Sequence, residues 1–128
     1  LTMSGYPAKI ELLGFRSDGR WLASACLGEL TWWDFGGKGP KGTAPAVGTA
    51  HTSRVTWLAW QPDGSALASG DQSGAVLLWP SPTSSRQDVA PSDVLDGTSA
   101  VAASSWTPDG TGVVVGRHDG TVSMHRVR

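Results

Sequence analysis

The feature that most constrains this chain is a short block that recurs three times at nearly constant spacing. Each copy places an aromatic residue, one variable residue and a Ser or Pro ahead of an Asp-Gly pair, and the pairs begin at Asp18, Asp63 and Asp109. An Asp-Gly pair between apolar runs supplies the positive-φ glycine that tight hairpin turns need. The chain is therefore expected to be a series of repeated antiparallel hairpins.

Short apolar runs flank each block and have the length of strands. In the second unit we expect strands at 54–60, 66–70 and 75–79, and the other two units follow the same frame. The longer connections contain candidate outer strands at 46–49 and 94–95. Because no stretch shows a sustained helical period of apolar residues, the predicted class is all-β. The Gly-, Pro- and Ser-rich loops at 36–42 and 81–86 are expected to be exposed and mobile.

The three units resemble the WD-repeat (WD40) β-propeller family, whose unit of about 40–45 residues ends its third strand with Trp-Asp. Trp33-Asp34 retains that dipeptide, Trp79-Pro80 retains half of it, and His125-Arg126 retains neither. The resemblance implies a β-propeller segment of three four-stranded antiparallel blades, one of them split at the ring seam. The units expected within the single segment 1–128 are 3–49, 50–95 and 96–128.

Three blades are too few for a closed ring, because propellers close with about four to eight blades. The chain begins within or just after an outer-strand position and ends on a third strand, with a leader or further domains before Leu1 left open. Two explanations remain: the chain is a piece of a larger propeller, or copies associate into a homo-oligomer.

In the WD40 family a His, a Ser or Thr, a turn Asp and a Trp often form a structural hydrogen-bond network within each blade. We expect no unit to contain all four, because Ser73 occupies the acidic position of the second unit and Leu27 that of the first. The expected members are His51, Ser69 and Trp79 in the second unit, Ser24 and Trp33 in the first, where Tyr6 replaces His, and Asp119 in the third.

Partner contacts in this family are commonly made at the end of the blades where each first strand begins. The resemblance implies that the candidate partner-binding residues there are Lys9, Arg54, Gln72, Arg117 and His118. Trp57 lies at a first-strand position where relatives often carry small or polar residues. It is expected either to anchor an interface or to pack between adjacent blades.

The charge and motif content exclude several other classes of function. A net charge of −1 gives no overall attraction to nucleic acid, and the apolar runs are too short for a membrane-spanning helix. The histidines His51, His118 and His125 and the single Cys26 lack metal-ligand spacing, so no metal or cofactor is expected. No Gly-x-Ser-x-Gly motif is present, and the loop with Lys38 lacks a phosphate-binding ending.

These observations favour a non-catalytic scaffold that binds protein partners. The alternative is a ligand-binding or hydrolytic propeller with its site in the central channel, and an engineered self-assembling fragment is a third hypothesis. A single cysteine cannot form an intrachain disulfide, which is consistent with a cytoplasmic location.

Overall fold

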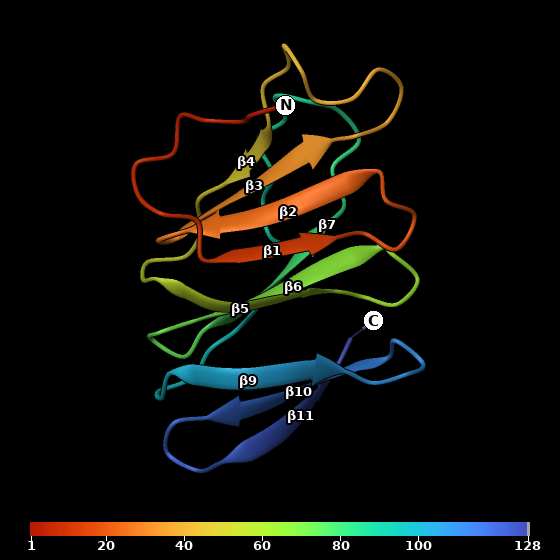
Figure 1. Ribbon diagram of the computed structural model, residues 1–128. Coiled ribbons are helices and arrows are strands. Elements are labelled where there is room, and N and C mark those ends of the chain that lie inside the picture. The colour runs from red at the N-terminus through yellow and green to blue at the C-terminus, as the bar shows by residue number, and fades with distance from the viewer. Residues whose placement is uncertain (128) are drawn as a thin grey trace.

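The fold is known from a computed structural model, which describes residues 1–127. The described residues contain eleven strands in three antiparallel sheets (Figure 1). The strands are β1 (Leu12–Phe15), β2 (Trp21–Cys26), β3 (Glu29–Asp34), β4 (Ala46–Gly48), β5 (Val55–Trp60), β6 (Ala66–Asp71), β7 (Val76–Pro80), β8 (Asp93–Leu95), β9 (Val101–Trp106), β10 (Gly112–Arg117) and β11 (Val122–Arg126).

Each sheet is a meander of consecutive strands, and we call the three sheets blades 1, 2 and 3. Blade 1 contains β1 to β4, blade 2 contains β5 to β8, and blade 3 contains β9 to β11. The first strands lie side by side, since β1 contacts β5 and β5 contacts β9, and the sheets stack in chain order (Figure 1). The all-β prediction is confirmed, and the three blades form an unclosed stack in which the described part of blade 3 has three strands.

The predicted strands of the second unit agree with the observed β5, β6 and β7 to within one residue at each end. Both predicted outer strands are also present, as β4 and β8. The agreement follows from turn chemistry: Gly19, Gly64 and Gly110 have φ values of 74°, 79° and 75°. In each turn the aspartate before the glycine accepts a hydrogen bond from the backbone N–H two residues further on, at 2.9 to 3.1 Å.

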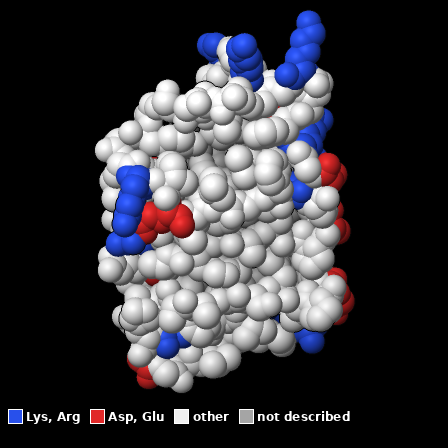
Figure 2. Space-filling model, viewed as in Figure 1, with Lys and Arg blue, Asp and Glu red and all other residues white. Residues whose placement is uncertain are grey.

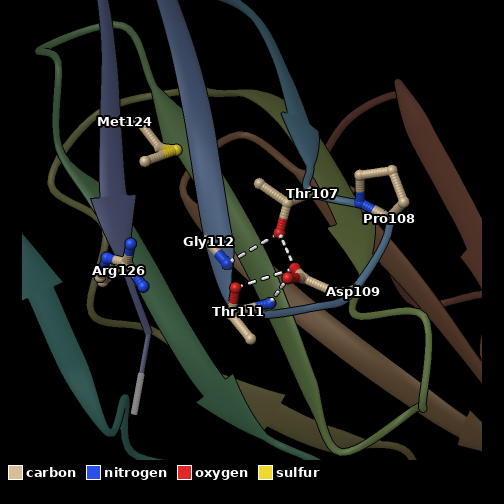
Figure 3. Close-up of a pocket in the computed structure, with 7 residues that line it drawn as sticks. All are labelled: Thr107, Pro108, Asp109, Thr111, Gly112, Met124 and Arg126. Atoms are coloured by element: carbon tan, nitrogen blue, oxygen red, sulfur yellow. Dashed lines mark hydrogen bonds between the residues drawn. The ribbon is translucent and has the colours of Figure 1, made fainter.

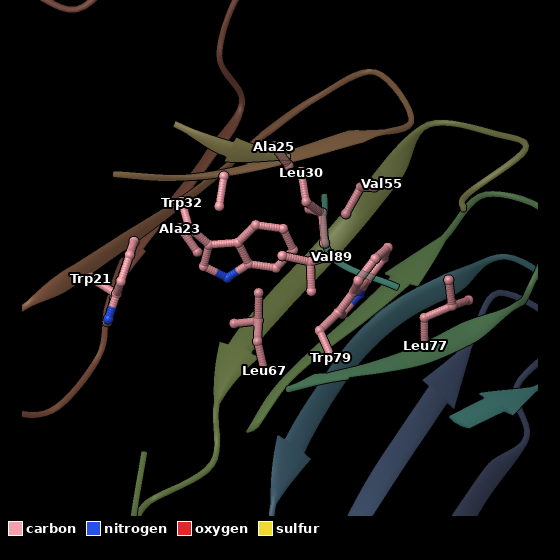
Figure 4. Close-up of a cluster of buried hydrophobic side chains, with 11 residues drawn as sticks. Trp21, Ala23, Ala25, Leu30, Trp32, Val55, Leu67, Leu77, Trp79 and Val89 are labelled. Atoms are coloured by element: carbon pink, nitrogen blue, oxygen red, sulfur yellow. The ribbon is translucent and has the colours of Figure 1, made fainter. Parts of the chain in front are cut away.

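Two apolar clusters hold the blades together. The cluster between blades 1 and 2 centres on Trp32 and Trp79, whose rings meet edge to face with centroids 5.5 Å apart (Figure 4). The cluster between blades 2 and 3 combines Trp106 with aliphatic side chains, among them Val101 and Val115. Burial of both clusters supplies most of the driving force for stacking, because isolated sheets cannot bury two faces.

The connection between β7 and β8 differs from the expected free loop. Pro82 is buried, and the 87–89 segment runs back along blade 1. Val47 N–H donates to the carbonyl of Gln87 at 2.9 Å, and Val89 N–H donates to the carbonyl of Val47 at 2.8 Å. Val89 is 6% exposed and packs in the cluster between blades 1 and 2. A loop of blade 2 therefore fastens the outer strand of blade 1.

Candidate functional site

A chain of buried hydrogen bonds crosses blade 2 on the side facing blade 1. Trp79 Nε1–H donates to Ser69 Oγ at 2.8 Å, and Ser69 Oγ lies 2.6 Å from His51 Nε2. His51 Nδ1 lies 2.7 Å from Asp71 Oδ2. All four residues are buried, so each polar atom depends on its neighbour rather than on water.

The protonation states in this network follow from burial. Burial lowers the pKa of His51 below its ordinary value, although Asp71 opposes the shift. The pKa of the Asp71 carboxyl is also lowered: burial acts to raise it, but hydrogen bonds from Ser73 and His51 outweigh burial. A neutral His51 then donates from Nδ1 to the carboxylate and accepts at Nε2 from the Ser69 hydroxyl, which satisfies every member.

The expectation that the second unit lacks its acidic member was wrong. Ser73 does occupy the position before the turn glycine, but Asp71 reaches His51 from the end of β6. The second carboxylate oxygen of Asp71 accepts from the backbone N–H groups of Ser73, Gly74 and Ala75 at 2.9, 3.0 and 3.1 Å. The Asp71 carboxylate therefore has two roles: one oxygen closes the turn, and the other completes the network with His51.

Ser69, His51 and Asp71 are connected in the same order as a hydrolytic Ser-His-Asp triad. Two features argue against catalysis. Ser69 is 0% exposed, and its oxygen accepts the indole N–H of Trp79 rather than facing an open space. A nucleophile must reach a substrate carbonyl, so this network stabilises the blade instead.

Blade 1 keeps the Ser and the Trp of this network, as Ser24 and Trp33, but has other residues at the His and Asp positions. Tyr6 stands at the His position, and its hydroxyl lies 2.9 Å from the oxygens of Ser24 and Thr31. Trp33 Nε1–H donates to the same hydroxyl at 2.7 Å. Cys26 occupies the position of Asp71, and its thiol lies 3.5 Å from the carbonyl of Ala8. The network of blade 1 is thus uncharged and centred on one tyrosine.

The described residues of blade 3 form no comparable network at these positions. Gly97 stands at the His position, and the guanidinium of Arg117 packs directly over it. Arg117 Nη1 donates to the carbonyls of Gly74 and Ser99 at 2.6 and 2.9 Å, which links blade 3 to the turn of blade 2. Asp119 lies outside this space and accepts from Thr121 within its own turn.

Four of the six candidate partner-binding residues are exposed, and they lie in the connections next to the starts of β1, β5 and β9, the end of the blades that is at the left of Figure 1. They are Lys9, Arg54, Gln72 and His118. Backbone bonds bring the turns of this end against the starts of the first strands: Gln72 N–H donates to the carbonyl of Arg54 at 2.9 Å. The Arg54 side chain forms an ion pair with Glu11.

The other two candidates have roles inside the molecule. Arg117 is held by the carbonyls described above, and Trp57 is half-buried against the cluster between blades 2 and 3. Sequence reasoning missed Leu27, which is 50% exposed at the same end with a φ of 55°. The signal in the sequence was the turn between β2 and β3, which is one residue shorter than the equivalent turn of blade 2. The shorter turn leaves Leu27 in a left-handed backbone conformation that favours glycine.

Other kinds of site find little support. Residues 1–127 bring together no group of three or more His, Cys, Asp or Glu side chains suited to a metal ion. The same residues contain no helix long and apolar enough to cross a membrane. The first strands β1, β5 and β9 carry no charged residue and no histidine.

We expect the stability of the chain to fall as the pH drops below about 6.5, the ordinary pKa of histidine. Folding lowers the pKa of His51, so the unfolded chain binds a proton at this histidine more readily than the folded chain does. Acid therefore stabilises the unfolded state relative to the folded state. Urea unfolding at a series of pH values measures the slope. The His118→Gln variant, altered at an exposed histidine, should keep that slope, whereas His51→Gln should reduce it. Equal slopes in both variants would contradict the assignment.

Comparison with known proteins places the fold. The family model described as WD domain, G-beta repeat matches residues 44–80 and 90–126. The C-terminal WD40 domain of Sif2 is similar, with a TM-score of 0.80 and 15% identity, covering 98% of this chain and 36% of that one. A chain of the mitotic checkpoint complex has a TM-score of 0.77 and 23% identity, covering 97% of this chain and 38% of that one. No curated protein sequence matches.

The chain therefore spans well under half the length of the two solved chains that it resembles. Their structures agree with its three stacked sheets, and the family model covers more than half of its residues, in both the second and the third unit. This chain belongs to the WD40 family of β-propeller repeats.

Proposed function

We propose that this chain is a non-catalytic, cytoplasmic WD40 scaffold that binds protein partners through the exposed end where its first strands begin. We also propose that further propeller blades cover its two open sheet faces, either from a longer chain or from other copies. The observation that carries the proposal is the gathering of Lys9, Arg54, Gln72 and His118 at one end of a rigid stack. Loop residues held on a rigid scaffold are where binding residues concentrate.

The surface supports binding at the ends rather than in the channel. In the view of Figure 2 the charged side chains lie toward the rim of the molecule, and the central area carries none. A hydrolytic channel needs titratable groups, and the first strands β1, β5 and β9 supply none. The similarity to a chain of the mitotic checkpoint complex, an assembly of proteins, agrees with a binding role.

The Arg54→Glu variant tests this proposal. Proteins that the immobilised wild-type chain retains from an extract of its own cells should bind the variant about tenfold more weakly, or worse, since a reversed charge costs more than 1.4 kcal/mol of contact energy. The matched control is Lys41→Glu, which reverses an exposed charge on the outer loop and should bind as wild type does. Equal binding by all three chains would contradict a partner site at this end.

A further inference from the structure

Two contacts repeat wherever one blade packs on the next. The first joins the ends of the first strands: Trp60 Nε1–H donates to the carbonyl of Gly14 at 3.0 Å, and Trp106 Nε1–H donates to that of Ala59 at 2.9 Å. The second joins a turn to the preceding blade. Gln61 Nε2–H donates at 2.6 Å to the carbonyl of a turn glycine, residue 110.

The same turn contact occurs between blades 1 and 2. The turn at Gly64 packs on Arg16, since a Cβ added to that glycine would lie 3.1 Å from Arg16 Cγ. Arg16 holds the position in blade 1 that Gln61 holds in blade 2. Each blade thus receives the Asp-Gly turn of the blade that follows it. The cleft that receives the turn of blade 3 is lined in part by Leu78 and Pro80.

Blade 3 has the equivalent cleft, and none of residues 1–127 places a turn in it. A pocket of about 350 Å³ opens beside Thr107, Met124 and Arg126, which stand where blade 2 has Gln61, Leu78 and Pro80 (Figure 3). Hydrogen bonds fix its rim, because Thr107 Oγ1 bonds both the Asp109 carboxylate at 2.7 Å and the N–H of Gly112 at 3.0 Å. The sheet face beside the pocket is apolar and open: Val122 is 74% and Met124 57% exposed.

Blade 1 has the equivalent turn, but among the described residues no other blade packs on its glycine. The position of a Cβ at Gly19 has no neighbouring atom within 4 Å, whereas the turns of blades 2 and 3 are packed. The face beside this turn is also apolar, with Leu13 64% and Phe15 51% exposed. These two residues stand where blade 2 has Leu58 and Trp60, which pack against the cluster between blades 1 and 2.

We propose that a second copy of the chain covers these faces head to tail, with its Asp18-Gly19 turn in the pocket beside Thr107, Met124 and Arg126. The inference rests on the proposed function, in which propeller blades cover the open faces. Among residues 1–127, one turn and one cleft of matching kind are left without a partner, and the apolar faces beside both are exposed. Two copies supply six blades, within the four to eight that close a propeller ring.

A closed ring of two copies contains two identical contacts, each joining blade 3 of one copy to blade 1 of the other. Wild type should therefore sediment at twice the mass of one 13.3 kDa chain. Met124→Glu should give monomers, since it places a charge on the blade 3 face of both contacts. Phe15→Glu should also give monomers, since it places a charge on the blade 1 face of both contacts. Mixed in equal amounts, the two variants should recover a dimer, because one intact contact remains between them.

The matched control is Val94→Glu, which places the same charge on an apolar residue that is 51% exposed on the outer strand β8. It should remain a dimer, and circular dichroism should show all three variants folded. A mixture that stays monomeric, or single variants that still dimerise, would overturn the head-to-tail contact. A wild-type chain that is monomeric at every concentration would point instead to further blades of a longer chain. Neither result would affect the partner site tested by Arg54→Glu.

Discussion

Replacing Asp71 by alanine should lower the free energy of unfolding by about 3 kcal/mol or more. The carboxylate accepts from His51 and from three backbone N–H groups of the following turn, and the residue is 0% exposed. Its removal leaves the buried imidazole N–H of His51 without an acceptor, which costs about 1–3 kcal/mol, and takes one acceptor from each of the three turn N–H groups. Urea unfolding followed by tryptophan fluorescence measures the change. The loss of stability is calculated from the shift of the urea midpoint, provided that the dependence of the unfolding free energy on urea concentration is unchanged.

Asp119→Ala is the matched control for Asp71→Ala. Asp119 holds the position before the turn glycine where the family pattern places the acidic member, but its side chain is exposed and its carboxylate accepts only from Thr121 in its own turn. Its replacement should cost less than about 1 kcal/mol. If Asp119→Ala costs as much as Asp71→Ala, the acidic group of the network has been assigned to the wrong residue.

Replacing Gly48 by alanine should cost about 3 kcal/mol, the upper part of the usual range for overpacking a core. A Cβ at this position in β4 would lie 2.5 Å from Trp79 Cζ3 and 3.1 Å from Trp32 Cη2. Trp79 cannot move aside without breaking its hydrogen bond to Ser69. Thermal unfolding should show the loss, and near-ultraviolet circular dichroism should report the displaced indole rings.

Gly116→Ala provides the comparison, since Gly116 also lies within a strand. The nearest atom to its Cβ would be the carbonyl oxygen of Ala103 at 3.5 Å, an ordinary contact. Alanine there should change stability by less than about 0.5 kcal/mol. Comparable losses at Gly48 and Gly116 would mean that strand glycines matter for backbone reasons and not for the space beside Trp79.

The fold was predictable because its determinants are local. An Asp-Gly pair forms its turn from its own side chain and its own glycine, so three pairs at Asp18, Asp63 and Asp109 set three hairpins. The apolar runs around them have little alternative to pairing with each other. The strands of the second unit could therefore be predicted to within one residue, whereas β1 begins at Leu12, three residues later than the same frame places it.

The buried networks were only partly predictable, because their members come from positions about 20 residues apart. Family spacing indicated Ser73 as the acidic position, yet the side chain that reaches His51 is two residues earlier at the end of β6. Arginine is usually a surface residue. Arg117 packs inward because Gly97, which has no side chain, leaves room for its guanidinium. Local sequence patterns do not predict the space available beside a residue, because that space depends on how the linker before each blade crosses the sheet.

The differences among the three blades at these positions also bear on how repeated sequences avoid mispairing while they fold. Blades with similar strands can exchange partners, and a linker from one unit can dock on the sheet of another. Here such an exchange is penalised: the linker carrying Tyr6 offers no imidazole to Asp71, and the linker carrying His51 would meet the charged guanidinium of Arg117. Each linker is suited to its own sheet. The sequence divergence among the units thus makes each linker specific for its own sheet, which favours a single order of blades.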